Sequence, residues 1–170
     1  MKHERKQSQQ ENVCRKMIAK EELNILWSLE QTAEKYADRV AVSDVNQELT
    51  WKELVKKAEV IGAELSEKVQ PGNPVTVLLE KSAETLAVML GIVYAGCFYV
   101  PVNPMNPTER LRKIMEKLDP EVIISDEKGK EQLAAVGNGL ENKVMGPEAL
   151  KTATGTELSE EQYSRLEQIQ

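Results

Sequence analysis

Apolar residues recur at two different spacings, and segments with the two spacings alternate along the chain. Three short segments are apolar without polar alternation, which is typical of strands covered on both faces: Val75–Leu79, Cys97–Val100 and Val122–Ser125. Apolar residues at helical spacing predict helices over residues 25–36, 51–65, 82–93 and 107–118. Because strands and helices alternate with short connections, we expect an α/β fold with a largely parallel, doubly wound sheet and flanking helices.

Turn and cap residues mark where the first elements begin. Val40–Ser43 and Glu48–Leu49 flank the polar turn Asp44–Gln47, which predicts a small hairpin. Thr50 and Glu53 then form a capping box, in which each side chain bonds a backbone amide at the start of the next helix. A helix is therefore expected to begin directly after the hairpin.

Later elements carry similar signals that become weaker along the chain. Ser82 is predicted to cap the helix that follows the first buried strand. Asn106 is predicted to cap another helix, with Pro107 at its first helical position. Beyond these, the pattern indicates a helix over Glu131–Val136 and a short strand over Lys143–Met145.

The length of 170 residues suits one domain. Residues 1–22 are predicted to be a polar tail without an export signal, and residues 151–170 a polar linker or helix. The uncharged stretch Thr85–Val102 approaches the length of a membrane span, but glycines and a proline interrupt it. Its character also changes midway from Leu, Ala and Met to Phe, Tyr and Val, so a buried helix followed by a buried strand is expected.

Charge and composition exclude several classes of function. With 22 Lys and Arg against 28 Asp and Glu, the net charge is −6, which gives no general footprint for nucleic acid or an anionic membrane. Two cysteines cannot form a disulfide framework, so a reducing cytoplasm is the expected location. The one histidine, His3, lies in the tail, which excludes a His-based zinc site or a Ser-His-Asp triad in the folded part.

Parallel sheets place ligands beyond the carboxyl ends of their strands, which indicates three loops as candidate sites. These loops are Glu80–Ser82, Val102–Asn106 and Ser125–Glu127. The first joins a strand to a helix, so its amides suit an anion, yet it lacks the glycines of a phosphate cradle. A helix cap is therefore the favoured role for Ser82.

Four other features could belong to a ligand or catalytic site, but each has a simpler structural interpretation. Thr152–Thr156 has the hydroxyls and glycine of a phosphate loop but no following lysine, and is interpreted as a linker. Gly137–Gly139 lacks the third glycine of a dinucleotide motif and is interpreted as a turn. Asp126 and Glu127 suit a metal or, more simply, a solvated turn, and Cys97 is interpreted as a packing residue. Residue chemistry alone therefore indicates no catalytic constellation.

Two motifs resemble those of the adenylate-forming (AMP-binding) ligases, which include peptide-synthetase adenylation domains, D-alanine:carrier-protein ligases and acyl-CoA synthetases. Leu49–Leu54 (LTWKEL) is similar to the family's early Leu-Thr-Tyr-x-Glu-Leu motif. Val93–Pro104 (VYAGCFYVPVNP) is similar to its second motif, and Asn106–Leu111 (NPTERL) matches the helix start that follows. Order and spacing agree as well, so the chain from about residue 26 to 128 resembles the beginning of such an enzyme.

The match departs from the family pattern at two positions. Trp51 stands where the family usually has tyrosine, and Asn103 stands where amino-acid-activating members usually have aspartate. Asparagine there is more similar to acyl-CoA synthetases, whereas the Pro-Thr-Glu-Arg-Leu continuation is more similar to the amino-acid branch. Which acid is activated is therefore left open.

The resemblance implies an enzyme that joins a carboxylic acid, expected to be an amino acid, to the α-phosphate of ATP with Mg²⁺. The acyl group then passes to a thiol, either carrier-protein phosphopantetheine or CoA. Residues 23–150 would be an incomplete N-terminal portion of the large domain, and residues 151–170 would lead toward the phosphate loop. The family's phosphate loop, acidic ATP motif and lysine lie further downstream, so we assign no catalytic, nucleotide-binding or metal-binding residue and expect no activity from this chain alone.

Two other hypotheses are kept. The chain is a non-catalytic or split subunit that completes its fold on a partner chain, because a sheet that lacks later strands leaves open edges. Alternatively it is an unrelated small α/β binding domain, with the three candidate loops as its pocket.

Overall fold

The computed structural model describes residues 25–148. Its elements are α2 (Ile25–Tyr36), β1 (Val40–Ser43), β2 (Glu48–Thr50), α3 (Trp51–Ser66), β3 (Pro74–Leu78), α4 (Ala83–Tyr94), β4 (Phe98–Pro101), α5 (Thr108–Leu118), β5 (Val122–Ser125), α6 (Glu127–Val136), a 3-10 turn η2 (Leu140–Lys143) and β6 (Val144–Met145). The predicted tail (residues 1–22) and linker (residues 151–170) lie outside the described residues.

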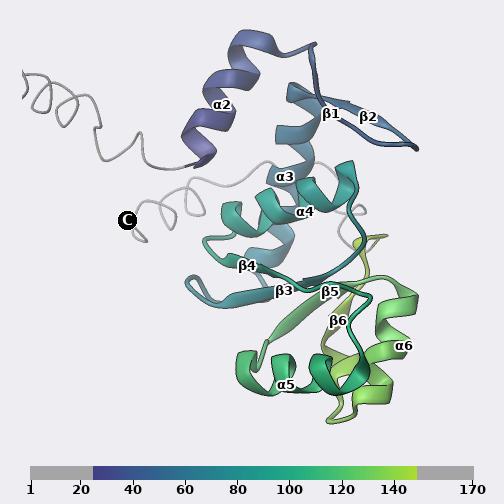
Figure 1. Cartoon of the computed structure of the whole chain (residues 1–170). Coiled ribbons are helices and arrows are strands. Elements are labelled where there is room, and N and C mark those ends of the chain that lie inside the picture. The colour runs from purple at the N-terminus through teal and green to yellow at the C-terminus, as the bar shows by residue number, and fades with distance from the viewer. Residues whose placement is uncertain (1–24, 149–170) are drawn as a thin grey trace, which may run out of the picture.

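A four-stranded parallel sheet in the order β4-β3-β5-β6 forms the centre of the fold. The chain passes from β3 outward to β4, then crosses back over β3 to β5. Opposite crossover directions put the connecting helices on opposite faces, with α2, α3 and α4 on one side and α5 and α6 on the other (Figure 1). The prediction of a parallel, doubly wound α/β sheet is confirmed. The antiparallel β1–β2 hairpin lies apart from this sheet.

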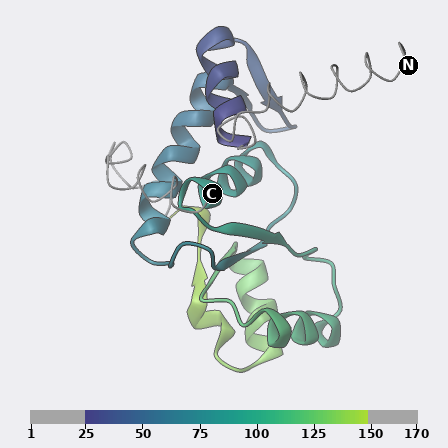
Figure 2. The ribbon, with the colours of Figure 1, turned by 90° about the vertical axis from the view of Figure 1, so that its left-hand side faces the viewer.

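Each face of the sheet has its own hydrophobic core, which explains the continuous apolar strands. Val75, Val77 and Ile124 pack with α2, α3 and α4. Leu78 and Ile123 pack with α5 and α6 on the opposite face. Figure 2 shows the helices that cover the two faces, turned by 90° from Figure 1. Complete burial of one such side chain stabilises the fold by about 1.5–3 kcal/mol. The helices on both faces are therefore needed to keep the sheet folded.

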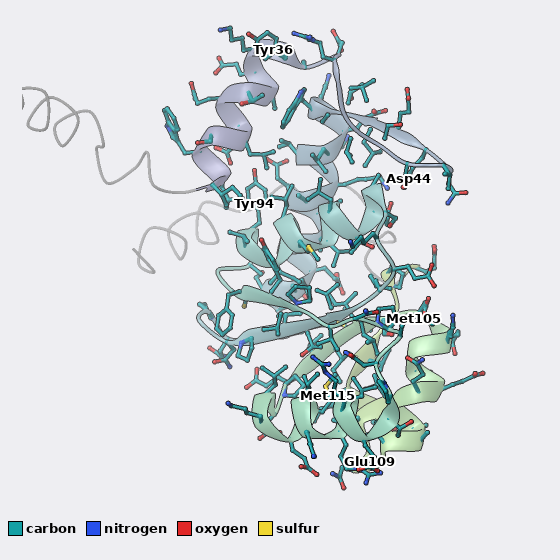
Figure 3. All side chains as sticks on the ribbon, in the orientation of Figure 1. Tyr36, Asp44, Tyr94, Met105, Glu109 and Met115 are labelled. Atoms are coloured by element: carbon teal, nitrogen blue, oxygen red, sulfur yellow. The ribbon has the colours of Figure 1, made fainter. Side chains whose placement is uncertain are left out.

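Helices α3 and α4 cross closely because each has a glycine at the crossing point. A Cβ atom placed on Gly62 would lie 2.5 Å from Tyr94 Cβ, and one placed on Gly91 would lie 2.6 Å from Ile61 Cβ. Tyr94 is 1% exposed, and its hydroxyl donates to Glu30 Oε1 at 2.9 Å, which ties α4 to α2 (Figure 3). The three helices therefore form one packed layer.

Several local predictions are confirmed by hydrogen bonds. The Thr50 hydroxyl accepts from the Glu53 amide at 3.3 Å, and the Glu53 carboxylate accepts from the Thr50 amide at 2.9 Å. Gly96, at φ +74°, ends α4, where its amide donates to Val93 O and the Cys97 amide donates to Ile92 O. This turn divides the uncharged stretch 85–102 into helix and strand, as expected. No helix within residues 25–148 has the length and apolar character to cross a membrane.

Strand β4 differs from its prediction as a buried strand. It begins at Phe98 rather than Cys97, and Phe98 and Tyr99 are 52% and 39% exposed. Of the described strands only β3 pairs with β4, so these side chains lie at the border of the sheet. An apolar run looks the same in the sequence whether the strand is central or at an edge, which is why the prediction was wrong.

Two helix starts also differ from the predictions. Pro107, rather than Asn106, is the N-cap of α5, and in the described part of the chain this helix start has no side-chain cap hydrogen bond. Helix α6 begins at Glu127, four residues before the predicted Glu131, because the Asp126 carboxylate accepts from the Gly129 amide at 2.8 Å. The two-residue strand β6 falls within the predicted segment Lys143–Met145.

Candidate functional site

A pocket of about 600 Å³ lies beyond the carboxyl ends of β3 and β4. Two of the three predicted loops, those that follow these strands, form its walls together with one side of α4. Its lining is mainly apolar and comprises Val77, Leu79, Glu80, Lys81, Thr85, Met89, Pro101, Val102, Asn103, Pro104 and Met105. Met105 is 75% exposed, so the pocket opens to solvent beside it (Figure 3).

The start of α4 forms one side of this pocket, and side chains of the chain itself bond its amides. The Ser82 hydroxyl accepts from the Thr85 amide at 3.1 Å, so the prediction that Ser82 is a helix cap is confirmed. The Asp44 carboxylate, from the β1–β2 turn, accepts from the Ala83 amide at 2.7 Å. An anionic ligand would meet a fixed carboxylate here, which makes this helix end unsuitable for a phosphate.

Asp44 is held in its charged form by three amides. The Ala83 amide lowers the pKa of Asp44 most, and the amides of Asn46 and Gln47, which donate to the other carboxylate oxygen, lower it further. The bond from Ala83 connects the hairpin turn to the start of α4, 39 residues away. Asp44 is therefore a structural anion beside the pocket.

The loop after β4 forms the opposite wall and is held in shape by polar contacts. The Asn103 side chain accepts from the Met105 amide at 2.9 Å, which closes a tight turn. Gln132, on α6, donates from Nε2 to Pro104 O at 2.9 Å. The position of this wall thus depends on a helix from the other side of the sheet.

The third predicted loop, after β5, does not line the pocket. The Ser125 hydroxyl donates to Leu78 O at 3.0 Å, and a Cβ atom on Gly129 would lie 3.1 Å from Leu78 Cδ2. Close packing therefore fills the space between β3 and β5, where the direction of the chain connections changes and doubly wound folds often bind ligands. Asp126 caps α6, and Lys128 lies 3.7 Å from Glu80 at the surface.

The remaining candidates have structural roles or lie outside the described residues. Gly137, Asn138 and Gly139 all have positive φ and form a turn, as predicted. Cys97 is 7% exposed, and burial raises its pKa, as expected for a packing residue. Within residues 25–148, no three acidic, cysteine or histidine side chains gather where a metal ion would bind. Thr152–Thr156 falls outside the described range.

Sequence reasoning misses two residues that shape the pocket. The pattern accounts for Asp44 only as a turn residue, and for Gln132 only as part of a weak helix. Both act through contacts across at least 28 residues of chain, to Ala83 and Pro104 respectively. The sequence carries no local signal for either contact.

A scan against protein families matches the description "AMP-binding enzyme" over residues 29–168, which is most of the chain. The chain belongs to the AMP-binding enzyme family. The resemblance found in its two motifs is thereby confirmed. The fold is that of an incomplete α/β domain of these adenylate-forming ligases, whose reaction depends on ATP.

This AMP-binding chain spans only a small share of the length of the curated relatives that it matches. Bacitracin synthase 1 of Bacillus licheniformis is 36% identical over 107 residues, which are 62% of this chain and 2% of that protein. Tyrocidine synthase 1 of Brevibacillus parabrevis is 32% identical over 122 residues, which are 71% of this chain and 11% of that protein. The chain thus spans a small part of each.

Solved structures show the same arrangement of elements. The Klebsiella oxytoca NpsA N-terminal subdomain, in complex with 3-hydroxybenzoyl-AMSN, superposes with a TM-score of 0.65 at 22% identity and covers 78% of this chain and 32% of that one. The nonribosomal peptide synthetase FmoA3, in an AMPPNP-bound form, superposes with a TM-score of 0.66 at 26% identity and covers 77% and 14% respectively. The fold is therefore shared with adenylation proteins.

Proposed function

We propose that this chain is the N-terminal scaffold of an adenylation domain. The complete domain activates an amino acid with ATP and Mg²⁺ and passes the aminoacyl group to a thiol, which is carrier-protein phosphopantetheine or CoA. The family match over residues 29–168 carries this proposal. The amino-acid branch is supported by 36% identity to bacitracin synthase 1 and by the PTERL segment at the start of α5.

The described residues contribute support rather than chemistry in this proposal. The phosphates of ATP do not fit the start of α4, because the Asp44 carboxylate already bonds the Ala83 amide. The polar residues of the pocket beside it are Glu80, Lys81, Thr85 and Asn103, within a mainly apolar lining. Attack of the substrate carboxylate on the α-phosphate of ATP brings two anions together, which requires concentrated positive charge and fixed amide donors. The described pocket does not concentrate such groups, so we infer that this chain alone does not form acyl-adenylate.

Amino-acid-dependent exchange between ATP and pyrophosphate tests both parts of the proposal. The 122-residue segment of this chain that matches tyrocidine synthase 1 would replace its counterpart in that protein, and exchange would be measured for this chimera and for the 170-residue chain alone. We expect exchange from the chimera within about tenfold of the parent, because shared scaffolds tolerate substitution when packing is kept, and none from the chain alone. A matched chimera that carries Gly91→Val should lose exchange, because the α3–α4 crossing has no space for that side chain.

Two results would overturn the proposal. One is a folded chimera without exchange, which would show that this segment cannot serve as an adenylation scaffold. The other is exchange by the 170-residue chain alone, which would show that it contains its own catalytic site.

A second candidate is a split subunit that completes its fold on a partner chain. One observation favours it. The two-residue strand β6 lies at the border of the sheet, and β5 is its one hydrogen-bonded neighbour among the described strands.

A further inference from the structure

Helices α2 and α3 lie side by side (Figure 2), and a groove of about 520 Å³ lies between them. The α3 residues that line it are on a different side of that helix from Ile61 and Gly62, which contact α4. The Lys52 amide donates to Ala37 O at 3.1 Å, so the start of α3 is level with the end of α2. The groove therefore follows the second half of α2 and the first half of α3.

An apolar floor and charged rims give this groove the character of a helix-binding site. Its residues are Ala33, Glu34, Ala37, Lys52, Val55, Lys56, Glu59 and Val60. The alanines leave space between the helices, and the two valines are half-buried. Lys52 and Lys56 are exposed, and neither forms an ion pair with another described residue. An amphipathic helix binds such a groove with its apolar face inward and its charges at the rims.

The segment of chain that precedes α2 has a matching pattern. Val13, Cys14, Met17 and Ile18 fall on one face when the segment is helical, whereas Ala19 falls on the opposite face. The segment is covalently joined to α2, so its local concentration at the groove is higher than that of any separate chain. These apolar residues therefore form the natural complement of the groove floor.

The length of the segment also suits the groove. Helical residues rise about 1.5 Å each, so residues 13–22 span about 15 Å, the length of ten residues of α2. A two-residue connection remains before α2 begins, and helical hairpins have loops of about two to five residues. Running antiparallel to α2, the segment brings Cys14 level with Glu34. One turn earlier, Glu11 comes level with Lys52, which carries the opposite charge.

We propose that residues 13–22 form a helix that folds back along α2 and occupies the α2–α3 groove. The segment then belongs to the folded unit. The chain before residue 13 is thereby directed toward the end of α2, where β1 begins. This inference does not depend on the proposed function, because it concerns a face of the fold to which the scaffold role gives no part.

Disulfide trapping tests the position of the segment. Cys14 is the natural probe, because the other cysteine, Cys97, is 7% exposed. Glu34→Cys introduces a thiol in the groove, and Ser28→Cys introduces a matched thiol at an exposed position on another side of α2, nearer to Cys14 in the sequence. After oxidation of the 170-residue chain by oxidised glutathione, we expect at least about tenfold more intramolecular disulfide to Cys14 in the Glu34→Cys protein, because the bond requires Cβ atoms about 3.5–4.5 Å apart. Equal yields, or a higher yield from Ser28→Cys, would overturn the proposal.

The rate at which Cys14 reacts with a thiol reagent provides a second test. Docking should slow this reaction in the native chain by at least about tenfold relative to the chain unfolded in urea. Met17→Lys places a charge against the apolar floor and should remove that protection. Ala19→Lys adds the same side chain on the opposite face of the helix and should leave the rate within about twofold of the wild type.

Three results of the labelling experiment would refute docking. Rapid reaction of Cys14 in the native wild-type chain would show that the segment is unprotected, as it would be if another segment or chain filled the groove. Equal loss of protection in Met17→Lys and Ala19→Lys would show that no particular face of the helix is bound. Protection without the disulfide to the Glu34→Cys position would place the segment elsewhere. Neither measurement uses activity, so the outcome is independent of ATP–pyrophosphate exchange by the chimera.

Discussion

The substitution Gly91→Ala tests whether close helix contact, rather than helix propensity, decides stability at the α3–α4 crossing. The new Cβ atom would lie 2.6 Å from Ile61 Cβ and 2.9 Å from Ala58 O, whereas ordinary contacts of this kind are 3.4–4 Å. The two helices would therefore have to separate by about 1 Å, which loosens the packing of a layer that covers one whole face of the sheet.

The expected magnitude follows from two opposing effects. Overpacking a closely packed site costs about 1–3 kcal/mol, and the contact with a backbone oxygen puts this case at the upper end. Replacing glycine by alanine within a helix returns up to about 1 kcal/mol. The net loss is about 2 kcal/mol in the free energy of unfolding, or about 8 °C in Tm for a domain of this size.

Thermal and urea unfolding followed by circular dichroism would measure this loss. Gly146→Ala is the matched control, because a Cβ atom there would have nothing within 4 Å, and it should change stability by less than about 0.5 kcal/mol. A Gly91→Ala protein that melts at or above the wild-type temperature would refute the reasoning, since helix propensity would then outweigh the contact.

Three further predictions concern single side chains. The folded-state pKa of Asp44 lies below its ordinary value of 3.8, so the stability that this carboxylate contributes is complete above pH 3.8 and is lost as the pH falls through the lowered folded pKa. Asp44→Asn should therefore flatten the decline of the urea-unfolding free energy in acid. An acid profile equal to that of the wild type would contradict this. Thr50→Ala removes the capping box at α3 and should cost about 1 kcal/mol in urea unfolding, whereas Thr32→Ala, where a hydroxyl donates to a carbonyl within a helix, should be close to neutral. In a Cys14→Ala background, Cys97 should react with a thiol reagent only after urea unfolding, because burial raises its pKa; rapid reaction in the native protein would refute its assignment as a packing residue.

Interactions across three or four residues were predicted well from the sequence. The Thr50–Glu53 box and the Ser82 cap both appear in the structure as expected. Each depends on bonds between near neighbours, so the residue types and their spacing are sufficient to predict it. The alternation of apolar runs and helical periods predicted the doubly wound sheet for a similar reason, because both faces of a parallel strand must be covered.

The candidate site was predicted less completely. Two of the three expected loops line the pocket, but the third is excluded by packing of Ser125 and Gly129 against Leu78. Neither the contact of Asp44 with α4 nor that of Gln132 with the loop after β4 has a signal in the sequence. Such contacts form because the fold brings together residues that are tens of positions apart in the chain. The spacing of residues in the sequence does not give their distance in space.

The amino-acid sequence by itself determined where most elements begin and end, that the strands are apolar on both faces, and to which family the two motifs belong. Only the tertiary structure decided that β4 and β6 lie at the two borders of the sheet formed by the described strands, and that Gly62 and Gly91 meet. Local hydrogen bonds and apolar periodicity are properties of a few successive residues. The order of strands and the crossing of helices depend instead on which distant surfaces exclude water together, so they are settled only when the whole core is packed.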